Sequence, residues 1–120
     1  MIFILIFIIA SSIASMDILK DNFNNSIFKD LDGYFWNPTF SWKNKYKNFD
    51  KSQGRKYPNY LSGFTDTFSD AWHIFKLIVI ICMIIGFSIT KQFNIYYTII
   101  YWLEYGLVFK LFYSKILIKK

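Results

Sequence analysis

Residues 71–90 have the sequence AWHIFKLIVIICMIIGFSIT, and this stretch decides the class of fold. Residues 77–89 are apolar apart from Ser88. A run of about 20 apolar residues is the length that an α-helix needs to cross the hydrocarbon core of a bilayer. Lys76 lies near the start of the run, where its long side chain can extend to the membrane interface. The stretch therefore predicts a membrane-spanning helix.

The composition of the whole chain also indicates a membrane protein. Its 120 residues are 54% hydrophobic and 22% aromatic, and a soluble domain of this length cannot bury so much apolar surface. The single cysteine, Cys82, excludes an intrachain disulfide and a cysteine metal site, and its apolar neighbours indicate a packing residue. No glycine-rich phosphate-binding loop is present, and no serine or cysteine nucleophile pairs convincingly with the one histidine.

A second apolar run, residues 93–113, follows almost at once and contains Glu104 and Lys110 as its charged residues. Only Lys91 and Gln92 separate it from the first run. A connection this short predicts a tight antiparallel helical hairpin over residues 71–113. One long helix with a polar break is the alternative.

The chain begins with a third apolar run, residues 2–16, which is interrupted only by serines. Fifteen helical residues span ~22 Å and fall short of the ~30 Å hydrocarbon core, so we extend the predicted membrane segment to residues 1–19. A cleaved signal peptide is the alternative, because Ser12-Ile13-Ala14 has small residues at the two positions that a signal peptidase recognises. No Lys or Arg precedes the run, which favours a retained signal-anchor.

The distribution of basic residues predicts the orientation. Residues 17–70 hold eight Lys and Arg, and three more lysines follow residue 113. With three spans, the 17–70 segment and the C-terminus share one side, and the positive-inside rule makes that side cytoplasmic. The sequence thus predicts an all-α, multi-pass protein of the cell membrane with three transmembrane helices. Its parts are the anchor at 1–19, a mostly irregular aromatic and basic segment at 20–70, the hairpin at 71–113 and a basic tail at 114–120.

The 20–70 segment is too rich in aromatic residues to be a disordered linker. It is therefore expected to pack on itself, on the membrane surface or on a partner. Short helices are predicted around residues 27–31 and 39–48, and Ser52-Gln53-Gly54 predicts a turn.

Basic and aromatic residues interleave within this segment and form the candidate binding surface. Next to a membrane, such a mixture suits anionic lipid headgroups, at roughly 1 kcal/mol for each cation near the surface. Another membrane protein is a second candidate partner, and a solvated patch that only fixes topology is the simplest explanation. Lysines among aromatics also suit single-stranded nucleic acid, but a membrane tether makes that partner unlikely. The candidate residues are Trp36, Trp42, Lys43, Lys45, Tyr46, Lys47, Lys51, Arg55 and Lys56.

Several motifs rich in Trp, Asn and Lys lie between residues 35 and 87, namely Phe35-Trp36-Asn37-Pro38, Ser41-Trp42-Lys43-Asn44-Lys45-Tyr46-Lys47-Asn48, Gln53-Gly54, Asp70-Ala71-Trp72-His73 and Phe75-Lys76. In these motifs the chain resembles a family of small uncharacterised membrane proteins of Bacteroidota and their phages. The resemblance covers under half of the chain and excludes the third predicted helix. It implies a membrane protein and no particular activity.

Asp66, Asp70 and His73 are spaced i, i+4 and i+7, which places them on one face of a helix. Two carboxylates and an imidazole can hold a divalent metal such as Zn²⁺, Mn²⁺ or Fe²⁺ with open positions. The simpler explanation is that Asp66 or Asp70 caps a helix N-terminus and that the aromatic groups anchor the interface.

Glu104 is a carboxylate near the middle of a predicted span, where a charge is costly and indicates a partner or a function. Counted from the connection at Lys91, Glu104 and Lys76 lie ~20 and ~23 Å deep on antiparallel helices. The sequence therefore predicts a Glu104–Lys76 ion pair that holds the hairpin together. A proton or ion relay that includes His73 and neighbouring tyrosines is the functional alternative.

The most direct interpretation is a non-enzymatic, membrane-anchored interaction or scaffolding protein. Two other classes stay open. One is a metal-dependent membrane enzyme that uses Asp66, Asp70 and His73. The other is a pore-forming protein similar to a holin, although the long aromatic segment does not fit that class.

Overall fold

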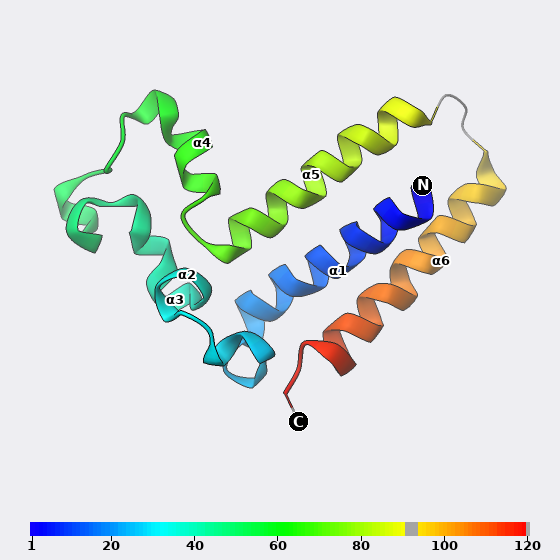
Figure 1. Ribbon diagram of the computed structural model, residues 1–120, viewed down its shortest axis with the longest axis horizontal. Coiled ribbons are helices and arrows are strands. Elements are labelled where there is room, and N and C mark those ends of the chain that lie inside the picture. Colours follow the sequence, from blue (N-terminus) through cyan, green and yellow to red (C-terminus); the bar gives the residue numbers. More distant parts are fainter. Residues whose placement is uncertain (91–93, 120) are drawn as a thin grey trace.

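The computed structural model of the protein describes residues 1–90 and 94–119, and every named element in these ranges is helical. Three long helices, α1 (Ile2–Asp21), α5 (Ala71–Ile89) and α6 (Ile95–Leu111), run side by side (Figure 1). A π-helical turn, Phe112–Ile116, continues α6. The all-helical fold is therefore as predicted. The predicted turn at Lys91 and Gln92 and the final Lys120 lie outside the described residues.

Short helices connect α1 to α5. Three of them are α-helical: α2 (Gly33–Trp36), α3 (Pro38–Ser41) and α4 (Ser62–Thr67). The others are 3₁₀ turns at Phe23–Asn25, Ile27–Asp30, Trp42–Lys45, Lys47–Phe49, Lys51–Gln53 and Asn59–Leu61. The segment predicted to be mostly irregular is thus a succession of short helical turns, and the helices expected around 27–31 and 39–48 are among them.

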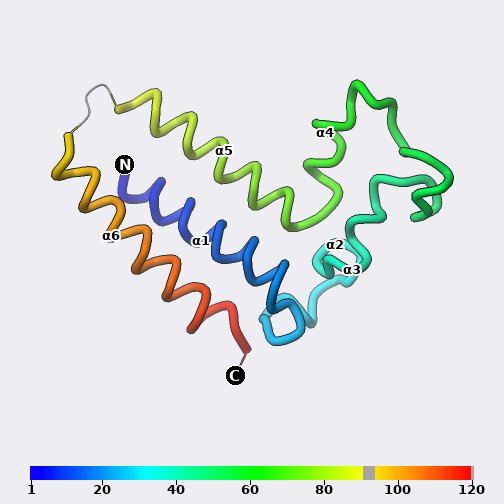
Figure 2. Tube along the Cα trace, turned by 180° about the vertical axis from the view of Figure 1, so that it is seen from behind, coloured from blue at the N-terminus to red at the C-terminus, as the bar shows by residue number. Residues whose placement is uncertain are grey.

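The N-terminal helix α1 lies between α5 and α6 (Figures 1 and 2). At the end where α1 begins, Leu5 faces Gly86 of α5, and the rings of Phe3 and Tyr101 pack edge to face with centroids 5.2 Å apart. At its other end, Nδ2 of Asn22 donates to the hydroxyl of Tyr113, 2.7 Å away. Helix α1 is therefore antiparallel to α5 and parallel to α6.

The position of α1 between α5 and α6 differs from the simple hairpin predicted for residues 71–113. Helices α5 and α6 do run in opposite directions, but each packs on α1 rather than on the other (Figure 2). The physical reason is the row of small buried residues along α1, which lets two helices approach its backbone closely. These residues are Ala10, Ser12, Ala14 and Ser15. Two of them, Ser12 and Ala14, are the small residues that supported the signal-peptide alternative in the sequence.

The hydrophobic core lies at the end of the helical layer where α1 finishes and α5 starts. Ile18 and Leu19 of α1 are almost fully buried there, together with Ala71 of α5. Phe23 and Phe28, from the first turns after α1, complete this core with Leu117 from beyond α6. The core therefore joins the three long helices to the start of the 22–70 segment.

The C-terminal residues are attached to the same end. The amide of Ile27 donates to the carbonyl of Leu117 over 2.8 Å, and the amide of Lys119 donates to the carbonyl of Asn25 over 2.6 Å. The ammonium group of Lys119 also pairs with the carboxylate of Asp30. The basic tail predicted at 114–120 is therefore held against the 22–30 turns as far as it is described.

The molecule is flat, with extents of 52 × 40 × 17 Å along its principal axes. A single layer of helices leaves much of each helix uncovered, and only 6% of the apolar 18-residue stretch of α5 is buried, against 39% for α1. Both helices are long and apolar enough to cross a membrane. Helix α6, which corresponds to the predicted third span, has 17 residues.

Candidate membrane-surface site

The 22–70 segment extends sideways from one end of the helical layer, and side-chain caps shape it (Figure 1). Ser26 accepts from the amide of Phe28, Asp32 from Tyr34, Asn37 from Thr39 and Asp50 from Ser52, with N···O distances between 2.9 and 3.2 Å. Asn, Asp and Ser favour this position because their short side chains satisfy the amides that a helical turn leaves free. The frequent Asn, Asp and Ser residues therefore explain why the segment folds into successive turns.

Residues 43–56 form a closed structure that we call the basic loop. The amide of Lys47 donates to the carbonyl of Gly54, and that of Lys56 to Lys45, both over 3.0 Å. The chain reverses between these bonds through a left-handed Asn48, with φ 50°, and Gly54, with φ 78°. The turn predicted at residues 52–54 is thus present, and its glycine adopts a conformation that other residues avoid.

Three lysines of the basic loop rest on aromatic rings rather than on carboxylates. The ammonium of Lys43 lies 5.6 Å from the ring centroid of Trp42, and that of Lys45 lies 5.6 Å from the centroid of Tyr46. Lys56 lies 4.8 Å from the centroid of Phe49. In the part of the chain that the structure describes, none of these lysines forms an ion pair, nor do Lys47 and Lys51. Their charges therefore remain available to an anionic surface.

Arg55 and Trp36, which the sequence predicted to be part of the binding surface, have other roles in the structure. Nη1 of Arg55 lies 2.5 Å from Oδ2 of Asp66, and the hydrogen bond to this carboxylate raises the pKa of the guanidinium. Trp36 is half-buried, and its ring stacks on Phe28 with centroids 5.0 Å apart. Arg55 thus ties the basic loop to α4, and Trp36 belongs to the core. Trp42 is 42% exposed, in keeping with a surface role.

The three predicted metal-ligating residues are divided between two contacts. Asp70 caps α5 by accepting from the amide of His73 over 3.0 Å, and its other oxygen lies 2.8 Å from Nδ1 of the His73 ring. Asp66 pairs with Arg55 instead. Within residues 1–90 and 94–119, no three His, Cys, Asp or Glu side chains are grouped as metal ligands. The arrangement supports the capping explanation for Asp70.

The structure does not bring Lys76 and Glu104 together. The ammonium of Lys76 lies 5.4 Å from the ring centroid of Trp72, on its own helix, and no ion pair of the described residues includes Glu104. Oε2 of Glu104 is buried and has no hydrogen-bond partner among those residues. The two residues stay apart because Lys76 lies on α5 and Glu104 on α6, and α1 lies between these two helices.

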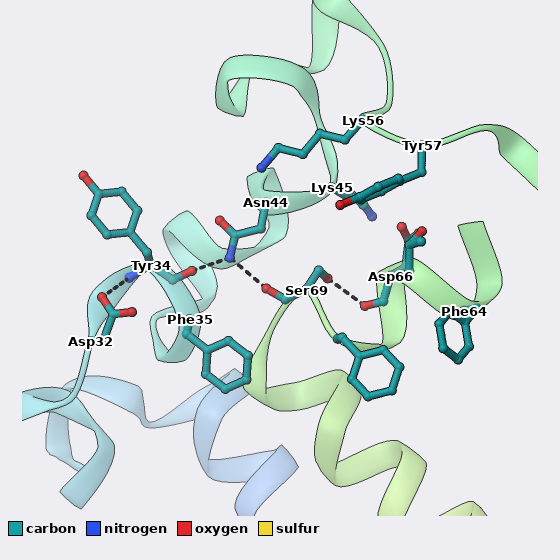
Figure 3. Close-up of a pocket in the computed structure, with 12 residues that line it drawn as sticks. Asp32, Tyr34, Phe35, Asn44, Lys45, Lys56, Tyr57, Phe64, Asp66 and Ser69 are labelled. Atoms are coloured by element: carbon teal, nitrogen blue, oxygen red, sulfur yellow. Dashed lines mark hydrogen bonds between the residues drawn. The ribbon is translucent and has the colours of Figure 1, made fainter. Parts of the chain in front are cut away.

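A pocket of about 500 Å³ opens between the basic loop and α4 (Figure 3). Asn44 is central to it, since Nδ2 donates to the carbonyl of Tyr34 over 2.6 Å and to that of Ser69 over 2.7 Å. Figure 3 shows Lys45, Lys56 and Tyr57 gathered on one side of Asn44. The pocket therefore combines cations, aromatic rings and an amide at the point where the chain turns into α5.

Sequence reasoning missed Asn44 as a site residue. It lies between two candidate lysines in a stretch where lysine and asparagine alternate, and nothing in its neighbours distinguishes it. Its role depends on a contact with Ser69, 25 residues away. Such a contact has no local signal.

Comparisons with known proteins identify no relative. No protein-family model matches the chain, and neither the curated proteins nor the solved structures contain a match to it. The functional conclusion therefore depends on the physical character of the described residues.

Proposed function

We propose that the chain is an integral membrane protein whose three long helices span the bilayer and whose 22–70 segment lies on the cytoplasmic surface. There the basic loop binds anionic lipid headgroups and presents a platform for a partner protein. The role is one of anchoring and scaffolding.

One observation carries the proposal, namely the exposed apolar surface of α5. Seven of its large apolar side chains are 38–76% exposed: Ile80, Ile81, Met83, Ile84, Ile85, Phe87 and Ile89. Full burial of such a side chain is worth about 1.5–3 kcal/mol, so in water each of them forfeits a substantial part of that gain. A bilayer removes the penalty for all seven. The surface thus matches a hydrocarbon surrounding.

The arrangement of charge supports the proposed orientation. The 22–70 segment and the C-terminal residues lie at the same end of the layer, and both are basic (Figure 1). Basic segments stay on the cytoplasmic side, where the leaflet is also the more anionic. The central position of α1 favours a retained anchor, because cleavage after residue 14 would remove most of the helix on which α5 and α6 pack.

The position of α4 supports contact with the interface. Figure 1 shows α4 beside the first turns of α5 rather than beyond its end. Leu61, Phe64 and Phe68 in and around α4 are 41–70% exposed, and the two rings pack on each other with centroids 5.2 Å apart. Exposed Phe and Leu side chains are typical of the apolar face of a helix that lies in the membrane interface.

Cysteine accessibility in intact cells tests the topology. Cys82 is replaced by Ala, and single cysteines are introduced at Tyr60, which is 84% exposed, and at the exposed Thr90. We expect a membrane-impermeant maleimide to label Thr90→Cys in intact cells and Tyr60→Cys only after permeabilisation. Labelling of Tyr60→Cys in intact cells would overturn the cytoplasmic placement.

Lysine acylation in nanodiscs tests headgroup binding. We expect the lysines of the basic loop to react more slowly in discs with anionic lipid than in discs of phosphatidylcholine, and the difference to vanish in 1 M salt, where the Debye length is about 3 Å. Equal reactivity in the two kinds of disc would contradict lipid binding and leave a partner protein as the remaining function of this surface.

A further inference from the structure

The pocket beside Asn44 contains a polar atom that the fold leaves without a partner. Nδ2 of Asn44 donates to two backbone carbonyls, which fixes the orientation of the amide because a carbonyl accepts only from the NH₂ group. Oδ1 is consequently the free acceptor. It is buried and receives no hydrogen bond from any described residue.

A buried acceptor without a donor costs about 1–3 kcal/mol, so the pocket is completed by a ligand that brings an N–H or O–H group. Two lysines, Lys45 and Lys56, also line the pocket, and neither is ion-paired within residues 1–90 and 94–119. Of the two carboxylates at the pocket, Asp66 is already neutralised by Arg55, and Asp32 offsets one of the two lysines. One positive charge remains in excess, and it favours an anionic group on the same ligand.

The apolar part of the lining adds a third requirement. Phe64 and Phe68, on the α4 side, are 70% and 52% exposed and lie next to the start of α5. Acyl chains that run along the apolar face of α5 can rest on these rings, while a headgroup enters the pocket. A soluble phosphate ester would satisfy the polar groups but would leave the rings uncovered.

We propose that this pocket binds the headgroup of one phospholipid, a phosphodiester whose alcohol carries a hydroxyl or ammonium donor. Lys45 and Lys56 hold the phosphate, and Oδ1 of Asn44 accepts the hydrogen bond from the alcohol. The inference rests on the proposed membrane function, because it names the lipid that the surface selects.

Retention of lipid by the detergent-purified full chain, measured by native mass spectrometry, tests the pocket. We expect the double variant Lys45→Gln/Lys56→Gln to bind phosphatidylglycerol about thirtyfold more weakly, since each cation near an anionic surface contributes a factor of about five. The matched control Lys20→Gln/Lys29→Gln removes the same charge from exposed lysines outside the basic loop and the pocket, and we expect its affinity to stay within about threefold of the parent. Equal losses in the two variants would overturn the site in favour of diffuse attraction.

A pair of lipids of equal charge tests the acceptor. Phosphatidylmethanol carries the same phosphate as phosphatidylglycerol but has no hydroxyl donor, and we expect it to bind about tenfold more weakly. Equal binding of the two lipids would overturn the role assigned to Asn44. No variant of Asn44 is needed, so the two carbonyl contacts that order the segment stay intact.

Glycerol 3-phosphate separates a lipid from a soluble ligand of the same chemistry. We expect it to displace phosphatidylglycerol only at concentrations far above those of the lipid, and displacement at equal concentration would overturn the lipid assignment. All these measurements use solubilised protein and do not depend on which side of the membrane the segment faces. A failure of the topology experiment therefore remains distinguishable from a failure of this site.

Discussion

At the scale of single residues, Asp70 shows how a pattern with two explanations is decided by geometry. Its carboxylate caps α5 through the amide of His73, and the residue is 6% exposed. The spacing of Asp66, Asp70 and His73 predicted either a helix cap or a set of metal ligands. The backbone contact shows that capping is its role in the described structure.

Replacement of Asp70 by Ala should lower the stability of the protein by about 1 kcal/mol, the usual loss for a missing N-cap. Asp70→Asn is the matched control, because asparagine caps helices equally well. The measurement is the thermal midpoint in detergent, followed by a thiol-reactive dye that reports the exposure of Cys82, which is 6% exposed in the fold. An equal loss in both variants would show that the carboxylate charge, and not the cap, stabilises this end of α5.

Glu104 provides a second prediction at this scale. Because Oε2 is buried without a partner among the described residues, Glu104→Gln should raise the stability, by about 1–3 kcal/mol, since it removes a charged group that burial penalises. The same thermal assay measures this change. A loss of stability that disappears in a Lys76→Gln background would instead support the ion pair predicted from the sequence.

At the scale of elements, the basic loop depends on the backbone of Gly54. Its φ of 78° and ψ of −179° lie in a region that is essentially restricted to glycine. Gly54→Ala should therefore open the loop locally, at a cost of about 1–3 kcal/mol. The readout is faster hydrogen exchange at the amides of Lys47 and Lys56, whose bonds close the loop.

Gly63 is the control for this prediction. It lies in α4, and a Cβ placed on it meets nothing within 4 Å. Gly63→Ala should leave the exchange of the Lys47 and Lys56 amides unchanged. It should also stabilise α4 by about 0.4–1 kcal/mol, because alanine lowers the conformational entropy of the unfolded chain. Unchanged exchange in Gly54→Ala would mean that the loop does not need its left-handed glycine.

The elements themselves were largely predictable, whereas their partners were not. The apolar run at 71–90 predicts α5, Ala71–Ile89, almost to the residue, because length and composition are local properties. Helix α1 is apolar on all sides, so its sequence shows no preferred face from which to infer neighbours. The small residues of α1 decide how the helices pack. From the sequence alone, Ser12-Ile13-Ala14 fits both a helix-packing surface and a signal-peptidase cleavage site.

At the scale of the whole molecule, the contact between Lys119 and Asp30 joins two parts of the chain that are 89 residues apart. The hydrogen bond and charge of Lys119 lower the pKa of the Asp30 carboxyl below its ordinary value. A carboxyl whose pKa is lower in the folded state stabilises the fold above its unfolded pKa, and this contribution is lost as the pH falls through the folded value.

We therefore expect the C-terminal residues to stay docked at neutral pH and to loosen only when the pH falls below the ordinary carboxyl range. The measurement is the protection factor of the Ile27 amide, which is bonded to Leu117, corrected for the intrinsic pH dependence of exchange. In Asp30→Asn, the protection factor of the Ile27 amide should already be lower than in the parent at neutral pH. It should then no longer fall as the pH is lowered. An acid transition that persists in Asp30→Asn would assign it to another group.

The candidate site belongs to this scale as well, which limits what the sequence could predict of it. The basic and aromatic composition of residues 43–56 is local and indicates a surface for anions. The pocket forms only because Asn44 reaches Ser69 and Arg55 reaches Asp66 across the chain. Arg55 and Trp36 were predicted as surface residues because their partners in the fold, Asp66 and Phe28, cannot be identified from the sequence.

The central position of α1 has a consequence for the order of biosynthesis. Of the three long helices, α1 is made first and is the one on which both later helices pack, so it lacks these partners while about fifty residues are synthesised before α5. Helix α6 then completes the other side of α1. Assembly therefore proceeds around a core that is made first, and a chain that stops before residue 94 still contains α1 and α5 as a pair with one open side.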